Sequence, residues 1–298
     1  MRPLRPLHRA WTPFLLSLLW LGVAACAPKE GARSPRRDPS AVVEQQRDAP
    51  APFALQARFD ITVKGPATGG STKGGLVMHA PDRLRVEILT PLGTPFYTLA
   101  TDGRALHVWS PRDTTFYRGD DALVVLGALS GGAVSPADLL SIFMARLPLP
   151  EAPLLSAVAV DRDVAVVLGA PKVPGCAEGG AAAGLRCEDL RLRALLDPRK
   201  DVVLSLELGR SGPDGGLELA ETFATVTYSD FRRVGRAWLP EGLVVSLPSL
   251  GWTLEVEVNA WDELGAIPDA FGLVPPPGAV QKSLVETLTR LAEQRKAP

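Results

Sequence analysis

Apolar and polar residues alternate along much of the chain. From Phe53 to Lys64 the odd positions are apolar, and the even positions from Gln56 onward are polar. A period of two predicts a strand with one buried face. Gly65-Pro66 and Gly69-Gly70 then mark a turn. Further strands are predicted at about 75–80, 83–90, 95–101, 104–110 and 113–118, and again at 154–169, 187–196, 201–210, 216–229, 236–247 and 250–259.

The alternation stops in the middle of the chain and near its end. Asp120–Leu129 and Ser135–Leu147 predict helices. Ser135 is a favourable N-cap for the second, with Pro136 in its first turn. Ala279–Lys296 predicts an amphipathic helix at the C-terminus.

These elements predict a mainly β protein. About eleven antiparallel strands must curl or close to protect their edges. The expected fold is a curled antiparallel sheet, an incomplete β-barrel, whose helices cover an apolar cavity. The open ends of such barrels are common ligand sites.

The first residues resemble a secretion signal. Met1–Arg9 is basic, and the apolar run Phe14–Ala25 is too short to span a membrane. The run ends in Val23-Ala24-Ala25-Cys26, which resembles the bacterial lipobox. Cys26 is therefore predicted to carry the lipid. The alternative is an ordinary signal peptide followed by a chance cysteine.

A lipid on Cys26 predicts a membrane-anchored protein. Ala27 follows the cysteine, where aspartate tends to retain lipoproteins at the inner membrane of Gram-negative bacteria. The expected location is the outer membrane, facing the periplasm. Residues 27–52 are rich in proline and charge, which predicts a flexible tether.

Composition argues against several function classes. Lys+Arg is 32 and Asp+Glu is 33, whereas a nucleic-acid partner favours a basic excess. With 3 His and 3 Cys, neither a metal site nor a cofactor site is expected. The chain has no Gly-x-Ser-x-Gly nucleophile elbow and no phosphate-binding loop, so an enzyme is not expected.

Two cysteines enclose a short glycine-rich segment. Cys176 and Cys187 in an exported chain predict a disulfide. Closing so short a loop is worth roughly 2–3 kcal/mol in the chain-entropy model. Free thiols or a metal-binding pair are the alternatives.

Several segments resemble the outer-membrane lipoprotein receptor family LolB. The first is Leu89-Thr90-Pro91-Leu92-Gly93-Thr94, which is similar to that family's Pro-Leu-Gly loop. The others are Ala57–Lys64, Gly74-Gly75-Leu76, Ser135–Leu140, Ala145–Pro148, Val226–Ser229, Leu239-Pro240 and Trp261. Phe271–Gly278 is more like the ending of LolA-type carriers.

The resemblance implies a function in lipoprotein transport. Proteins of this family bind the acyl chains of lipoproteins, accept them from a periplasmic LolA-type carrier and deliver them into the lipids of the outer membrane. By match, Leu92 is the exposed leucine that contacts the membrane. The alternative for Pro91-Leu92-Gly93 is a simple tight turn.

Alternation and the helix together predict the lipid-binding residues. The predicted cavity is lined by Phe59, Ile61, Leu84, Val86 and Ile88 of the sheet and by Leu140, Phe143 and Met144 of the covering helix. The predicted domains are a signal peptide 1–25, a tether 26–52, a LolA/LolB-like half-barrel 53–278 and a C-terminal helix 279–298. A lipid-binding or envelope-stress-sensing lipoprotein of the same fold, or a structural envelope lipoprotein, remains an alternative.

Overall fold

The computed structural model describes residues 37–48, 54–66, 69–122, 125, 135–148, 152–169, 189–212, 218–265, 270–288 and 290. The chain divides into two compact units, residues 1–38 and 39–298, and every described helix and strand belongs to the second. The predicted signal peptide, and most of the predicted helix Asp120–Leu129, lie outside the described residues.

The second unit is built almost entirely from strands. Three helices have both ends within the described residues: α2 (Pro39–Asp48), α4 (Pro136–Phe143) and the short 3₁₀ helix η3 (Pro248–Leu250). The first strands are β1 (Ala54–Lys64), β2 (Gly69–His79), β3 (Arg83–Leu89), β4 (Pro95–Thr101), β5 (Leu106–Ser110), β6 (Thr115–Gly119) and β7 (Leu154–Val160). The others are β8 (Asp163–Leu168), β9 (Leu190–Asp197), β10 (Val202–Ser211), β11 (Leu219–Val234), β12 (Ala237–Leu247), β13 (Trp252–Glu263) and β14 (Val280–Ser283).

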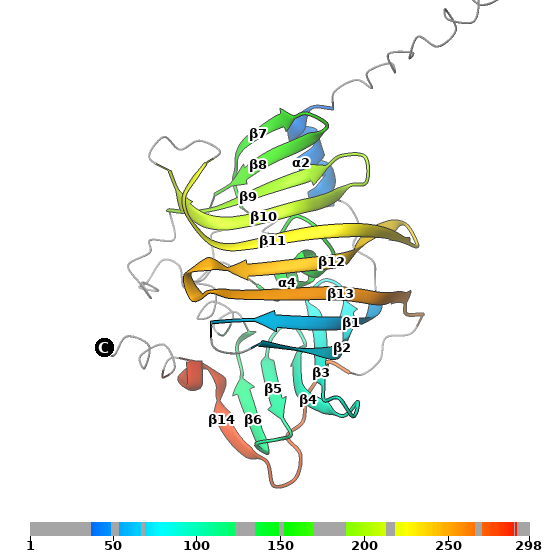
Figure 1. Cartoon of the computed structure of the whole chain (residues 1–298), viewed down its shortest axis with the longest axis vertical. Coiled ribbons are helices and arrows are strands. Elements are labelled where there is room, and N and C mark those ends of the chain that lie inside the picture. The colour runs from blue at the N-terminus through cyan, green and yellow to red at the C-terminus, as the bar shows by residue number, and fades with distance from the viewer. Residues whose placement is uncertain are drawn as a thin grey trace, which may run out of the picture. The chain divides into compact units, whose positions relative to one another are not determined.

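All of these strands join one sheet. Its order is β14-β6-β5-β4-β3-β2-β1-β13-β12-β11-β10-β9-β8-β7, fourteen strands in all (Figure 1). Neighbours are antiparallel except β14 and β6, which run parallel. The edge strands β14 and β7 do not pair with each other, so the sheet curls without closing. The predicted fold class, a mainly β incomplete barrel, is confirmed.

The sheet has two strands more than the twelve segments predicted as strands, for two local reasons. The segment 154–169 forms two strands, because Asp161 and Arg162 make a turn between β7 and β8. Asp161 takes a positive φ of 52° there, a conformation that aspartate tolerates better than most residues. The second extra strand is β14.

The C-terminal prediction needs correction. Val280–Ser283 pairs with β6 instead of starting a helix, and the described residues that follow it, 284–288 and 290, are helical. Val280 donates its backbone N–H to the Thr114 carbonyl at 2.9 Å, which continues the ladder. The free sheet edge at β6 provides these hydrogen bonds, and a helical pattern alone does not reveal that edge.

The tether also needs correction over part of its length. Pro39–Asp48 is a helix, α2, and it contacts β7 and β8. Val42 and Val43 are buried at 2% and 0% exposure. The Gln46 side chain is buried too; it donates to Asp201 Oδ1 and accepts from the Leu147 backbone N–H. The buried side chains of Val42, Val43 and Gln46 thus hold this segment on the sheet, although its composition is polar.

The predicted N-terminus of α4 is confirmed. Ser135 Oγ accepts from the Asp138 backbone N–H, and Asp138 Oδ2 accepts from the Ser135 backbone N–H, which completes a capping box. Leu140 and Met144 are buried at 2% and 4% exposure. The helix thus presents its apolar side to the sheet.

Candidate functional site

The concave side of the sheet is an apolar surface. In β1, Leu55, Ala57, Phe59 and Ile61 belong to the main hydrophobic cluster of buried residues. Val63 is partly buried and packs against the same cluster. The period-two pattern therefore places the apolar side of β1 inward, as predicted.

Strand register extends this surface across the sheet. Val63 pairs with Leu254, Leu254 with Val245, Val245 with Val226, and Val226 with Leu206. These five residues form one row, the apolar row, that crosses five adjacent strands from β1 to β10. Val63, Leu254 and Val245 are only partly buried. The row thus leaves apolar surface accessible near the end of the sheet where β1 ends.

The residues predicted to line a cavity do lie together. Phe59, Ile61, Leu84, Leu140 and Met144 are buried members of the main cluster. The remaining three, Val86, Ile88 and Phe143, are partly buried and pack against it. Their role in lipid binding stays a prediction.

Phe59 is held close to the backbone of β2. It pairs with Gly74 in the β1–β2 register, and its ring lies over that glycine. A Cβ atom added at Gly74 would lie 2.3 Å from the Phe59 ring. Glycine is therefore required for this close approach.

Two hydrogen bonds fix α4 on the concave side. Tyr228 Oη donates to the Ile142 carbonyl at 2.8 Å, and the Val203 backbone N–H donates to the Ala145 carbonyl at 2.8 Å. Burial raises the pKa of the Tyr228 hydroxyl, so the donor keeps its proton. Both acceptors lie at the C-terminal end of the helix or just after it.

Two hollows are present elsewhere on the described structure. One of about 700 Å³ is lined by Gln56, Arg58, Val77, Arg85 and Asp262 among others, and Arg85 there donates to the Ala270 carbonyl. One of about 420 Å³ lies between β6 and β14. Neither is lined by α4 or by the predicted cavity residues.

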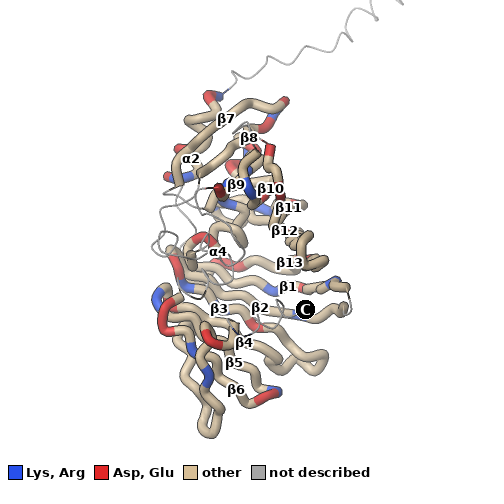
Figure 2. Tube along the Cα trace, turned by 90° about the vertical axis from the view of Figure 1, so that its left-hand side faces the viewer, with Lys and Arg blue, Asp and Glu red and all other residues tan. Residues whose placement is uncertain are grey.

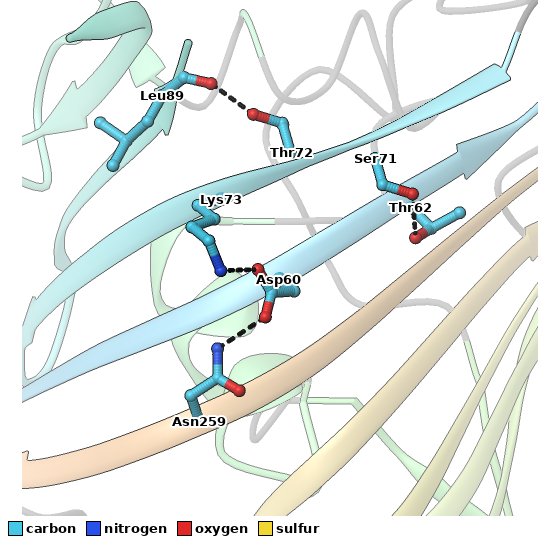
Figure 3. A network of polar contacts seen from close by, with 7 residues as sticks. All are labelled: Asp60, Thr62, Ser71, Thr72, Lys73, Leu89 and Asn259. Carbon is cyan, nitrogen blue, oxygen red and sulfur yellow. Dashed lines mark hydrogen bonds and ion pairs between the residues drawn. The ribbon is translucent and has the colours of Figure 1, made fainter. Parts of the chain in front are cut away.

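The outer side of the sheet is polar. Asp60 receives hydrogen bonds from Lys73 at 2.8 Å and from Asn259 at 2.9 Å, while Thr62 bonds Ser71 at 2.8 Å (Figure 3). The Lys73 hydrogen bond, then that of Asn259, lowers the pKa of Asp60. Acidic and basic residues are interspersed along the strands (Figure 2). The two faces thus differ sharply in polarity.

Leu92 lies at the tip of the β3–β4 turn and is 91% exposed. The turn is closed by Gly93, whose backbone N–H donates to the Thr90 carbonyl at 2.8 Å. Gly93 has a φ of 80°. The exposed position agrees with a membrane-contacting role, which stays a prediction, and the tight turn is present as well.

The other predicted sites lie outside the described residues. These are Cys26 and the pair Cys176 and Cys187. Among the residues that the structure does describe, no cluster of His, Cys, Asp and Glu could hold a metal ion. Within that same part of the chain, no helix has the length and apolarity needed to cross a membrane.

The fold is similar to that of LolA-type proteins. A putative outer membrane lipoprotein-sorting protein domain from Vibrio parahaemolyticus has a TM-score of 0.50 and 10% identity, covering 77% of this chain and 93% of that one. A LolA superfamily protein from Nitrosomonas europaea has a TM-score of 0.50 and 14% identity, covering 79% and 97%.

A third similar structure is a DUF1329 family protein from Desulfovibrio piger. It has a TM-score of 0.52 and 10% identity, covering 80% of this chain and 97% of that one. No family model and no curated protein matches the sequence. Because the identity is so low, the similarity to these structures shows the LolA-type fold alone.

Sequence reasoning missed part of the concave surface. Leu254 and Val245 belong to the apolar row, yet neither was among the predicted cavity residues. Alternation in Thr253–Val258 was a usable signal for Leu254. Tyr228 was missed for another reason: its hydroxyl partner lies 86 positions away in the chain, and no local pattern indicates it.

Proposed function

We propose that this protein is a lipid-anchored outer-membrane lipoprotein that binds the acyl chains of other lipoproteins on its concave face and helps to insert them into the outer membrane. One observation carries the proposal. The apolar row continues across β1, β13, β12, β11 and β10, and its members Val63, Leu254 and Val245 are only partly buried.

Burial of apolar surface supplies the driving force for such binding. Each methylene group transferred from water to an apolar surface contributes about 0.8 kcal/mol. A strand rises about 3.3 Å per residue, so a strand of six residues matches the length of a long acyl chain. No covalent step is needed, and an acyl chain has no polar group that the concave side must satisfy.

Helix α4 acts as the lid in this proposal. It covers the buried part of the concave side with Leu140 and Met144. The acyl chain first contacts the partly buried residues of the apolar row and then takes the place of the α4 side chains. A periplasmic LolA-type carrier is the proposed donor of the lipoprotein.

Adjacent valines on β12 give a direct test of acyl-chain binding. Val245 faces the concave side in register with Leu254, whereas Val244 pairs with Glu255 and is 37% exposed. We expect Val245→Glu to abolish capture of a fluorescent lipoprotein and Val244→Glu to leave it intact. Thermal unfolding verifies that both variants fold. Equal capture by the two variants contradicts the proposal.

Lipidation is tested separately at Cys26. We expect the wild-type chain to incorporate a clickable palmitate analogue and Cys26→Ser to lose the label. Retention of the label in Cys26→Ser would show that the lipid is carried elsewhere.

Depletion of the protein in cells separates insertion from the alternative functions. We expect lipoproteins to accumulate in the periplasm, because a carrier cannot unload them. A normal lipoprotein distribution after depletion excludes the insertion role and favours a sensing or structural role.

A further inference from the structure

At one end of the curled sheet, three neighbouring turns carry no charged residue. We call the end that holds the β1–β2, β3–β4 and β12–β13 turns the uncharged end. Strand register places these turns together at one end, because Lys64 pairs with both Gly69 and Thr253, and Leu89 pairs with Pro95. The turns have the sequences Gly-Pro-Ala-Thr (65–68), Thr-Pro-Leu-Gly-Thr (90–94) and Pro-Ser-Leu-Gly (248–251), without a charged residue.

Turns at the opposite end all carry charge where the structure describes them. They are β2–β3 with Asp82, β4–β5 with Asp102 and Arg104, β7–β8 with Asp161 and Arg162, β9–β10 with Arg199, Lys200 and Asp201, and β11–β12 with Arg236. At the uncharged end, charge lies on either side of these three turns: the β5–β6 turn carries Arg112 and Asp113, the β10–β11 connection carries Glu218, and the β8–β9 connection carries Asp189. A polarity difference along the strands is what a protein needs to place one end against an apolar phase.

Two turns at the uncharged end have the same construction. Gly93 donates its backbone N–H to the Thr90 carbonyl, and Gly251 donates to the Pro248 carbonyl at 3.1 Å. Gly93 and Gly251 both have positive φ, 80° and 65°. A leucine precedes each glycine, and both are exposed: Leu92 at 91% and Leu250 at 42%.

The second turn also carries an aromatic residue. Trp252 follows Gly251 and is partly exposed. Its ring lies over Gly65, where an added Cβ would be 2.8 Å from the ring atoms. Tryptophan is enriched where an apolar region meets water, as at a bilayer surface.

We propose that the β12–β13 turn, with Leu250 and Trp252, is a second contact with the phospholipid bilayer, in addition to the β3–β4 turn with Leu92. Two separate contacts fix the tilt of the sheet, which a single leucine cannot do. The partly buried end of the apolar row, with Val63, then lies toward the bilayer. The inference rests on the proposed function only for the lipid on Cys26, which keeps the protein at the membrane.

The anchor permits this arrangement. Cys26 and Pro39, the first residue of α2, are 39 − 26 = 13 positions apart. An extended chain spans at most about 3.3–3.6 Å per residue, so this linker reaches about 45 Å. This upper limit exceeds what contact with the membrane requires, so the lipid on Cys26 does not by itself set the orientation of the sheet.

The test uses the full lipidated protein in vesicles of phosphatidylethanolamine and phosphatidylglycerol at a ratio of about three to one. An environment-sensitive nitrobenzoxadiazole probe is attached to Leu250→Cys, Leu92→Cys or Val160→Cys, each with Cys176→Ser and Cys187→Ser. Val160 is the matched control: it is 43% exposed, against 42% for Leu250, and lies at the charged end.

We expect the probes at positions 250 and 92 to shift to shorter emission wavelength and to be quenched by lipids that carry a doxyl group on the acyl chain. The probe at position 160 should stay in water and remain unquenched. Behaviour at 250 that matches 160, with quenching at 92, overturns this inference and leaves the Leu92 role intact. Quenching at 250 together with normal lipoprotein capture by Val245→Glu supports the membrane contact and contradicts the proposed function.

Discussion

At the scale of single residues, the contact between Phe59 and Gly74 shows what strand register adds to a sequence pattern. The pattern predicted that Phe59 faces inward, and the structure confirms it as a buried residue. The pattern did not reveal that Gly74 lies opposite, because register depends on the partner strand. From the sequence, Gly74 is interpreted as marking the start of a strand. In the structure, its missing side chain leaves the space that the Phe59 ring occupies.

This contact predicts a large difference between two glycines of the same strand. Gly74→Ala places a Cβ 2.3 Å from the Phe59 ring and 2.8 Å from the Glu87 carbonyl oxygen. We expect the free energy of unfolding to fall by about 1–3 kcal/mol. At Gly70 nothing lies within 4 Å, so Gly70→Ala should change it by less than about 0.5 kcal/mol. Urea unfolding measures both, and equal effects would contradict the close approach.

Asp60 provides a second prediction, about titration. Its pKa lies below the ordinary value of 3.8 because Lys73, and then Asn259, donates to the carboxylate. The stabilisation is therefore present above the ordinary pKa and is lost as the pH falls through the lowered folded value. We expect Lys73→Met to bring the pKa of Asp60 back toward 3.8 in a carboxyl ¹³C NMR titration. An unchanged pKa would mean that Lys73 does not hold the charge.

At the scale of elements, local signals predicted helix α4 well and α2 not at all. Ser135 and Asp138 form a capping box that can be read from four residues. Pro39–Asp48 has a polar composition, and its helix is stabilised by distant partners: β7, β8 and Asp201. The same reason explains β14, which forms because β6 offers a free edge. Helices and strands that form only against a distant part of the chain cannot be predicted from the local sequence.

The hydrogen bond that fastens α4 predicts how easily the lid moves. Tyr228→Phe removes the hydroxyl that donates to the Ile142 carbonyl. We expect a loss of about 0.5–1.5 kcal/mol in the free energy of unfolding and faster capture of a fluorescent lipoprotein. Tyr97→Phe makes the same chemical change at a tyrosine that is 38% exposed, and should alter neither quantity. Slower or unchanged capture by Tyr228→Phe would contradict the lid role of α4.

At the scale of the whole molecule, sequence predicted the fold class and the polarity of the two faces, because both follow from a period of two. The difference between the two ends of the sheet needed the structure. Successive turns of an antiparallel meander fall at opposite ends, and register groups the uncharged β1–β2, β3–β4 and β12–β13 turns at one of them. The sequence pattern places Leu250 at the start of the predicted strand 250–259, whereas it lies in η3, in a turn that repeats the Leu-Gly pair of the β3–β4 turn.

A prediction about Leu92 concerns the whole molecule, because this residue is expected to orient the entire protein on the membrane. Insertion of one exposed leucine into lipid yields about 1.5–3 kcal/mol, too little to anchor the protein but enough to orient it while lipids on Cys26 hold it there. We expect Leu92→Glu to fold and to bind cargo normally, and to fail in transferring a fluorescent lipoprotein to liposomes. Val274→Glu is the control, because Val274 is 83% exposed but belongs to the segment between β13 and β14. Transfer by Leu92→Glu at the wild-type rate would leave Leu92 as the tip of a tight turn and nothing more.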